Sequence, residues 1–186
     1  MTLLEMKKKV LGLIEELNAD SEYLTDDPDI STKINDVINQ IMFEVVRLKK
    51  LPGYVEIPVT AGETITFERI EKASKYEVYQ LGMVRGVRCD YRAQGTVLKV
   101  LESGTAEIEF FRFPEVITAK TKNSYEFELP ADVLEIMPYG IAGDLLKSDI
   151  STEYGKIYSD RYERMKQMLD PRYSMTSIYI EGGVEV

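Results

Sequence analysis

The residues of this sequence that could carry out chemistry are mainly carboxylates, because histidine is absent and cysteine occurs once. Without histidine, neither the common zinc sites nor a Ser-His-Asp or Cys-His arrangement can be assembled within the chain. Carboxylate pairs such as Glu107 and Glu109, or Glu126 and Glu128, have the composition of a glycosidase site. Residues two apart on a strand share one face, so we expect these pairs to form the solvent side of strands.

Cys89 and an acidic run are two further candidates, and both have a plainer interpretation. Cys89 lies between Arg88 and Asp90, where a cation could lower the pKa of the thiol. Because apolar residues would share its face of a strand, we expect a small buried residue instead. The run from Glu15 to Asp29 has seven carboxylates and no base, but it lacks the spacing of a calcium loop. We therefore predict no catalytic residue and no metal or cofactor site.

The composition limits the size of the core and the kinds of partner. With 186 residues and 44% hydrophobic content, the chain can bury a core as one domain or two small ones. No apolar run approaches the roughly 20 residues of a membrane span, so we expect a soluble protein without membrane contact. The net charge of -9 opposes a phosphate-binding surface, which needs clustered lysine and arginine. We therefore expect no specific nucleic-acid binding.

Hydrophobic periodicity predicts a helical hairpin followed by a β region. Residues 3 to 17 and residues 30 to 50 carry apolar side chains at spacings of three and four, which is the pattern of two amphipathic helices. From residue 54 the apolar residues alternate with polar ones, and Pro58 indicates an edge or bulged strand. Further short strands, separated by glycine-containing turns, are predicted at residues 63–67, 76–80, 86–91, 96–101, 105–111 and 125–129. They predict an antiparallel sandwich or small barrel.

The C-terminal part of the chain is predicted to be helical again. Residues 131 to 147 are rich in helix formers, but Pro138 lacks an amide proton. We therefore expect a short first turn and a second segment that begins at Pro138. A final helix should begin near Ser151 and end before Pro171. One face of that helix should carry apolar and aromatic residues: Tyr154, Ile157, Tyr158, Tyr162, Met165 and Leu169.

These elements predict an α+β protein with a discontinuous helical bundle. The bundle would consist of residues 1–51 and 130–170, and residues 52–129 would be an inserted antiparallel β-sandwich or small barrel module. Residues 171–186 would form a C-terminal extension with strand-like alternation at Ile178, Tyr179 and Ile180. Such a segment could add as a strand to the sheet of a partner, or it could fold back onto the β module of its own chain.

Several short motifs follow one another in a fixed order. They are Phe113-Pro114, Glu128 to Asp132, Pro138 to Ala142, Leu145-Leu146, and a helix with Tyr158, Tyr162, Arg164 and Met165. The segment from Asp27 to Val46, in which D-P-D-I leads into an isoleucine-rich helix, adds a further match. In this order the motifs resemble the head-tail adaptor proteins (connector or head-completion proteins) of tailed bacteriophages and prophages. The resemblance covers about three quarters of the chain.

The resemblance implies a virion structural protein without enzymatic activity. Such a protein is made in the cytoplasm of the bacterial host and resides in the neck of the virion. It would self-associate into a ring, dodecameric in the family, and bind the portal protein on one side and tail or stopper proteins on the other. Many adaptors of this kind are almost entirely helical, and the inserted β module is similar to a variant that carries one. The tail morphology stays open.

A ring subunit must pack tightly within itself and must also present a surface to its neighbour. The small residues Gly140, Ala142 and Gly143, together with Pro138, would allow close approach inside the bundle. Tyr154, Tyr158 and Tyr162 would offer amphipathic contact area of the kind enriched at interfaces. The same tyrosines could instead fill the core of a monomer, since helical spacing alone does not distinguish the two.

A second function from a different class also fits the sequence. The β module could recognise a carbohydrate or a cell-surface ligand, with the helices acting as the stalk of a monomeric binding module. Exposed aromatic residues on one face of the sandwich, such as Tyr76 and Tyr79, would favour this alternative. A hydrolase that uses carboxylates is a more remote option.

Overall fold

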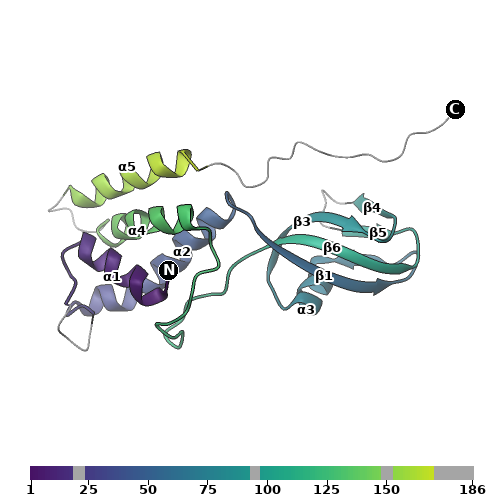
Figure 1. The fold of residues 1–186 in the computed structure, drawn as a ribbon, viewed down its shortest axis with the longest axis horizontal. Helices are drawn as coiled ribbons and strands as arrows, with labels where there is room; N and C mark the ends of the chain where they lie inside the picture. Colours follow the sequence, from purple (N-terminus) through teal and green to yellow (C-terminus); the bar gives the residue numbers. More distant parts are fainter. Residues whose placement is uncertain (19–23, 93–96, 148–152, 170–186) are drawn as a thin grey trace.

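The computed structural model describes residues 1–18, 24–92, 97–147 and 153–169. The molecule is elongated, with most of its helices in one half and the strands, together with the short helix α3, in the other (Figure 1). The helices are α1 (Leu3–Leu13), α2 (Pro28–Val46), α3 (Phe67–Ser74), α4 (Ala131–Leu145) and α5 (Tyr154–Gln167). The strands are β1 (Leu51–Val59), β2 (Thr64–Thr66), β3 (Val78–Arg85), β4 (Cys89–Arg92), β5 (Val97–Val100) and β6 (Gly104–Arg112). The predicted α+β class is confirmed. None of these helices is both long enough and apolar enough to cross a membrane.

Side-chain caps determine where the first two helices begin. The Thr2 hydroxyl accepts a hydrogen bond from the Glu5 amide at 3.2 Å, and the Glu5 carboxylate accepts one from the Thr2 amide at 2.8 Å. This capping box satisfies two amides that the helix itself leaves free. The Asp27 carboxylate accepts from amides in the first turn of α2, and Pro28 takes a position where no amide donor is needed.

α4 runs without interruption through Pro138, so the predicted break at this proline is wrong. A proline inside a helix removes one hydrogen bond and costs about 3 kcal/mol. Burial offsets this cost, because Val133, Met137 and Ile141 of α4 are all fully buried. Each apolar side chain of this size stabilises the fold by about 1.5–3 kcal/mol when it leaves water. Tertiary packing therefore outweighs the local preference.

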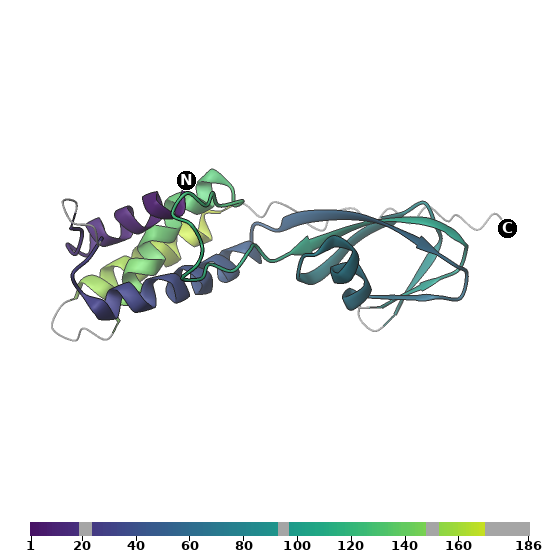
Figure 2. The same ribbon diagram turned by 90° about the horizontal axis from the view of Figure 1, so that it is seen from below.

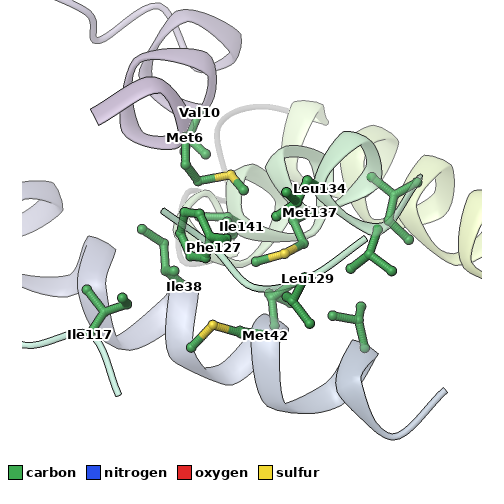
Figure 3. Close-up of a cluster of buried hydrophobic side chains, with 14 of the residues drawn as sticks. Met6, Val10, Ile38, Met42, Ile117, Phe127, Leu129, Leu134, Met137 and Ile141 are labelled. Atoms are coloured by element: carbon green, nitrogen blue, oxygen red, sulfur yellow. The ribbon is translucent and has the colours of Figure 1, made fainter. Parts of the chain in front are cut away.

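One hydrophobic core joins helices from both ends of the chain. It contains side chains of α1, α2 and α4, together with Tyr162 of α5 and residues that follow the sheet. Figure 3 shows side chains of α1, α2 and α4 pointing toward one another, with residues of the segment after β6 beside them. The labelled members are Met6, Val10, Ile38, Met42, Ile117, Phe127, Leu129, Leu134, Met137 and Ile141.

The segment that follows β6 packs on the helices. Residues 125–129, expected as a last strand, form a single β-bridge in which Glu126 pairs with Thr2. The apolar members Phe127 and Leu129 are buried in the helical core. These apolar residues alternate with carboxylates because the segment is extended and lies on the helices. One side of the segment faces the core, and the other side faces water.

Two three-stranded antiparallel sheets make up the other half, in the orders β1-β6-β3 and β2-β5-β4. β1 lies at an edge of its sheet, as Pro58 predicts. Both sheets contribute side chains to a second core, which also receives Ile70 of α3. α3 replaces part of an expected strand, because the chain turns into a helix after Thr66. Within the described residues the sheets do not close into a barrel.

Candidate assembly surfaces

The small residues of α4 lie where this helix meets α5. A Cβ atom added at Gly140 would lie 3.0 Å from a ring carbon of Tyr162 and 3.1 Å from Cδ1 of Ile41. A Cβ atom at Gly143 would lie 2.5 Å from the Ser159 hydroxyl and 3.0 Å from the Ser159 amide nitrogen. Ala142 is fully buried, and Pro138 is buried in the same helix. The backbones of α4 and α5 are therefore close at these two glycines.

The three tyrosines of α5 occupy three different environments. Tyr162 is only 4% exposed and belongs to the helical core, where burial and the nearby Glu44 carboxylate raise the pKa of its hydroxyl. Tyr158 is half-buried, and its hydroxyl donates a hydrogen bond to the Leu13 carbonyl at 2.6 Å. Tyr154 is 60% exposed. Tyr154 is thus the one of the three whose side chain lies mainly in solvent in a single chain.

The single apolar face expected for α5 is split into two faces. Tyr158, Tyr162 and Met165 face α4 and the core, whereas Tyr154 and Ile157 face solvent. The reason is the glycine contact described above, which selects the side of α5 that can approach α4. Ile157 is 52% exposed as a result.

The outer side of α5 carries a stripe of exposed residues at helical spacing. Tyr154, Ile157 and Met168 are 60%, 52% and 81% exposed. Arg161 and Arg164 complete the spacing, and both are exposed. We call these five residues the α5 stripe. Residues three and four apart share one side of a helix, so the stripe is continuous along α5 and just past its end.

The guanidinium groups of the stripe are held in place by their own chain. The Arg161 guanidinium lies 4.1 Å from the ring centroid of Tyr139. The Arg164 Nε donates to the Asp160 carbonyl at 3.2 Å. The flanking Glu163 is bound to Lys166 at 2.5 Å. Among the residues that the structure describes, neither arginine forms an ion pair with a carboxylate.

A second surface lies on the outer side of the β1-β6-β3 sheet. It is a concavity of about 590 Å³, and Tyr54 at its edge is 70% exposed. The side chains that point outward from the three strands are Tyr54, Glu56, Met83, Arg85, Glu107 and Glu109. We call these six residues the sheet face. Three carboxylates and one guanidinium give it a negative charge.

Aromatic and charged residues connect the helical half of the molecule to the half that contains the sheets, and we call this connection the joint. The Tyr79 hydroxyl of β3 donates to the Val46 carbonyl at the end of α2, at 3.0 Å. Its ring lies 4.9 Å from that of Phe113, which also packs against Phe43 of α2 at 5.3 Å between centroids. Burial raises the pKa of Tyr79 to about 12. Tyr79 is therefore part of the joint and is not an exposed platform for a ligand.

Two ion pairs lie near the joint, and one of them, Arg112 with Glu128, spans it. The buried Arg112 guanidinium donates two hydrogen bonds of 2.9 Å to the Glu128 carboxylate and stacks on the Tyr76 ring at 3.9 Å. The Lys49 ammonium lies 2.8 Å from the Asp132 carboxylate at the start of α4. The Lys49 hydrogen bond, more than any other contact, holds the pKa of Asp132 below its usual value.

The carboxylates and the cysteine that were considered as catalytic candidates either have structural roles or lie apart from one another. Glu128 is bound to Arg112, and Glu107 and Glu109 belong to the open sheet face. Burial raises the pKa of the Cys89 thiol, which is the opposite of the shift that activates a nucleophile. Among the residues that the structure describes, no three His, Cys, Asp or Glu side chains converge as a metal site would require. The predicted partner segment at Ile178, Tyr179 and Ile180 lies outside the described residues.

Comparison with known proteins gives no family assignment. A scan against protein-family models and a search of curated proteins both find no match. The kind of partner that this protein binds must therefore be inferred from the two exposed surfaces described above.

Proposed function

We propose that this protein is a head-tail adaptor, a structural subunit of the neck of a tailed bacteriophage or prophage. The observation that carries the proposal is the α5 stripe, in which Tyr154, Ile157 and Met168 are exposed. The opposite side of the helix packs on α4 and the helical core through Tyr162 and Met165. Large apolar side chains that gather on one exposed face mark a surface for another protein. The order of motifs from Phe113 to Met165 supports the adaptor class.

The proposal includes the finer architecture. Residues 1–51 and 113–170 act as one discontinuous bundle, residues 52–112 as an inserted β-sandwich module, and residues 171–186 as an extension toward a partner. The boundary expected at residue 129 moves to Arg112 because Ile117, Phe127 and Leu129 are buried in the helical core. The shared core of α1, α2 and α4 supports this division, since an insertion has to leave and re-enter a folded unit at adjacent points. The chain leaves the bundle at Leu51 and returns after Arg112, and these two residues are paired in the sheet.

The partners follow from the adaptor class. The protein is a non-enzymatic ring subunit, dodecameric as in the family, that joins the portal protein to tail or stopper proteins. The net charge of -9 supports a role beside DNA in transit without gripping it, since a strongly acidic protein does not bind phosphates. The motifs that carry the resemblance also have structural counterparts: Gly140 and Tyr162 form the contact between α4 and α5.

Co-assembly with a portal ring tests the proposed function. The purified protein is mixed with the portal ring of the phage or prophage that encodes it, and the mixture is separated by gradient sedimentation and imaged by electron microscopy. We expect a ring of added density on one end of the portal and none on the portal of an unrelated phage. Failure to bind the cognate portal at micromolar concentration would overturn the proposal.

A carbohydrate-binding module is the second candidate, and one observation favours it. Tyr54 is 70% exposed beside a concavity on the sheet, which resembles the stacking platforms that bind sugar rings. Tyr76 and Tyr79 do not add to such a platform, because Arg112 covers one ring and the joint holds the other. Measurable glycan affinity that is lost in Tyr54→Ala, together with no portal binding, would favour this candidate.

A further inference from the structure

We propose that the α5 stripe of one copy docks on the sheet face of the next copy, head to tail. The proposal rests on the proposed function only for the closing of these contacts into a ring. The two surfaces lie in opposite halves of the elongated molecule, as Figures 1 and 2 show, so they do not meet within one chain. A contact between two different surfaces of identical chains repeats from copy to copy, giving rings or filaments.

The six residues of the sheet face carry more negative than positive charge, with three carboxylates and one guanidinium. Glu56 of β1 lies directly opposite Glu107 of β6, and Glu109 lies two residues further along the same strand. Like charges directly opposite each other destabilise a sheet. Arg85 lies on the other side of Glu107 and is the one cation among the six residues of the face. A cation supplied by a neighbour would relieve this repulsion.

The α5 stripe has the complementary chemistry. Its two charged members, Arg161 and Arg164, are one helical turn apart, which places their Cβ atoms about 5–6 Å from each other. Glu107 and Glu109 are spaced about 6.6–7 Å along β6. Arginine binds carboxylate in a fork-like geometry, so two such pairs would set the register of a helix on the sheet.

Apolar residues match as well as charges. Tyr154 and Ile157 lie at one end of the stripe and Met168 at the other, with the arginines between them. On the sheet, exposed Tyr54 and Met83 lie on the two strands that flank β6 and its carboxylates. The arginines of the stripe thus lie between apolar side chains, and the β6 carboxylates lie between Tyr54 and Met83, with Glu56 and Arg85 also on the flanking strands. Burial of the apolar side chains would give affinity, and the pairing of the arginines with the β6 carboxylates would give register.

Charge reversal tests the pairing. Arg161→Glu/Arg164→Glu should weaken self-association by about tenfold or more, and Glu107→Arg/Glu109→Arg should do the same, as measured by sedimentation at increasing protein concentration. In an equimolar mixture both junctions between unlike variants are complementary, so the mixture should associate again, with the two variants alternating. Lys8→Glu on the exposed side of α1 is the matched control. If the mixture associates no better than either variant alone, the proposed pairing is wrong.

Cross-linking keeps the test decisive if either double variant folds poorly. In a Cys89→Ser background, a protein with Arg164→Cys is mixed with one that carries Glu107→Cys, and a short bis-maleimide is added. We expect covalent dimers from the mixture, but not from either protein alone or from Lys8→Cys mixed with Glu107→Cys. Equal yields for the two mixtures would overturn the proposal. Cross-linking without portal binding would instead leave this contact standing and remove the adaptor function.

Discussion

The hydrogen bonds of Asn39 are expected to be among the most sensitive points of the fold. Asn39 lies on α2, and its side-chain amide donates to the Ile117 carbonyl at 2.7 Å while its carbonyl accepts from the Ile117 amide at 2.8 Å. Both residues are buried. One side chain thus satisfies both backbone groups of a residue 78 positions away and binds the segment after β6 to the helical core.

The expected loss of unfolding free energy follows from the two backbone groups that Asn39→Ala would leave without hydrogen-bond partners. Two buried backbone groups of Ile117 would lose their partners, and each unsatisfied group costs about 1–3 kcal/mol. We therefore expect a loss of about 2–6 kcal/mol, which is a large part of the 5–15 kcal/mol typical of a domain. The adjacent Gln40 is exposed and makes one long bond of 3.2 Å to Asp144. Gln40→Ala should cost less than about 0.5 kcal/mol.

Denaturant unfolding of the two variants measures this difference. Alanine is the better helix former at both positions, and the gain is larger at Asn39, so helix propensity works against the expected difference. Hydrogen exchange supplies a second readout, because the Ile117 amide should lose protection in Asn39→Ala and keep it in Gln40→Ala. Equal unfolding free energies for the two variants would refute the reasoning, since the bonds of Asn39 would then contribute nothing beyond an exposed contact.

Three further predictions concern the helices and their ion pair. Gly143→Ala should destabilise by about 1–2 kcal/mol, because its Cβ would meet the backbone of α5, whereas Gly12→Ala has open space and should stabilise by up to about 1 kcal/mol in thermal unfolding. Tyr158→Phe should cost about 1 kcal/mol in the same assay, through loss of one hydrogen bond. The pKa of Asp132 is lowered in the fold, so its contribution is present above its ordinary pKa and is lost as pH falls through the lowered value. Asp132→Asn should therefore be less stable than wild type near neutral pH, and acidification in a pH series of unfolding should close that gap.

Helix positions could be predicted from the sequence where local signals agree. α1 and α2 combine apolar periodicity with start signals at Thr2 and Asp27, and the structure places helices there. At Pro138 the local signal points to a break, but the helix continues because three of its neighbours are fully buried. A single residue's preference is therefore a poor guide when the surrounding turns are all in the core.

The β region shows a different limit of prediction from the sequence. Alternation located β1 to β6, but it also extended the strand at β2 to Phe67, where α3 begins. The next residues, from Glu68 to Ala73, are mostly good helix formers, so a signal for α3 was present. Only Ile70 of α3 is buried, and one buried residue gives no periodicity to detect.

The surfaces were harder to predict than the elements, because distant residues determine them. Which tyrosines of α5 face the core depends on Gly140 and Gly143 of another helix. The joint depends on pairs such as Tyr79 with Val46, which lie 33 residues apart in the sequence. Periodicity describes one helix or strand at a time and contains no information about such pairs.

The joint bears on the ring that we propose. A closed ring needs the same rotation from each subunit to the next, and in the proposed contact that rotation would be set by the angle between the α5 stripe and the sheet face. A flexible connection would let the angle vary and would favour open chains over rings. Here the two halves share the Tyr79 hydrogen bond, the ring contacts of Phe113 and the bidentate pair of Arg112 with Glu128. Loosening this joint should therefore disturb ring closure while leaving each individual docking contact intact.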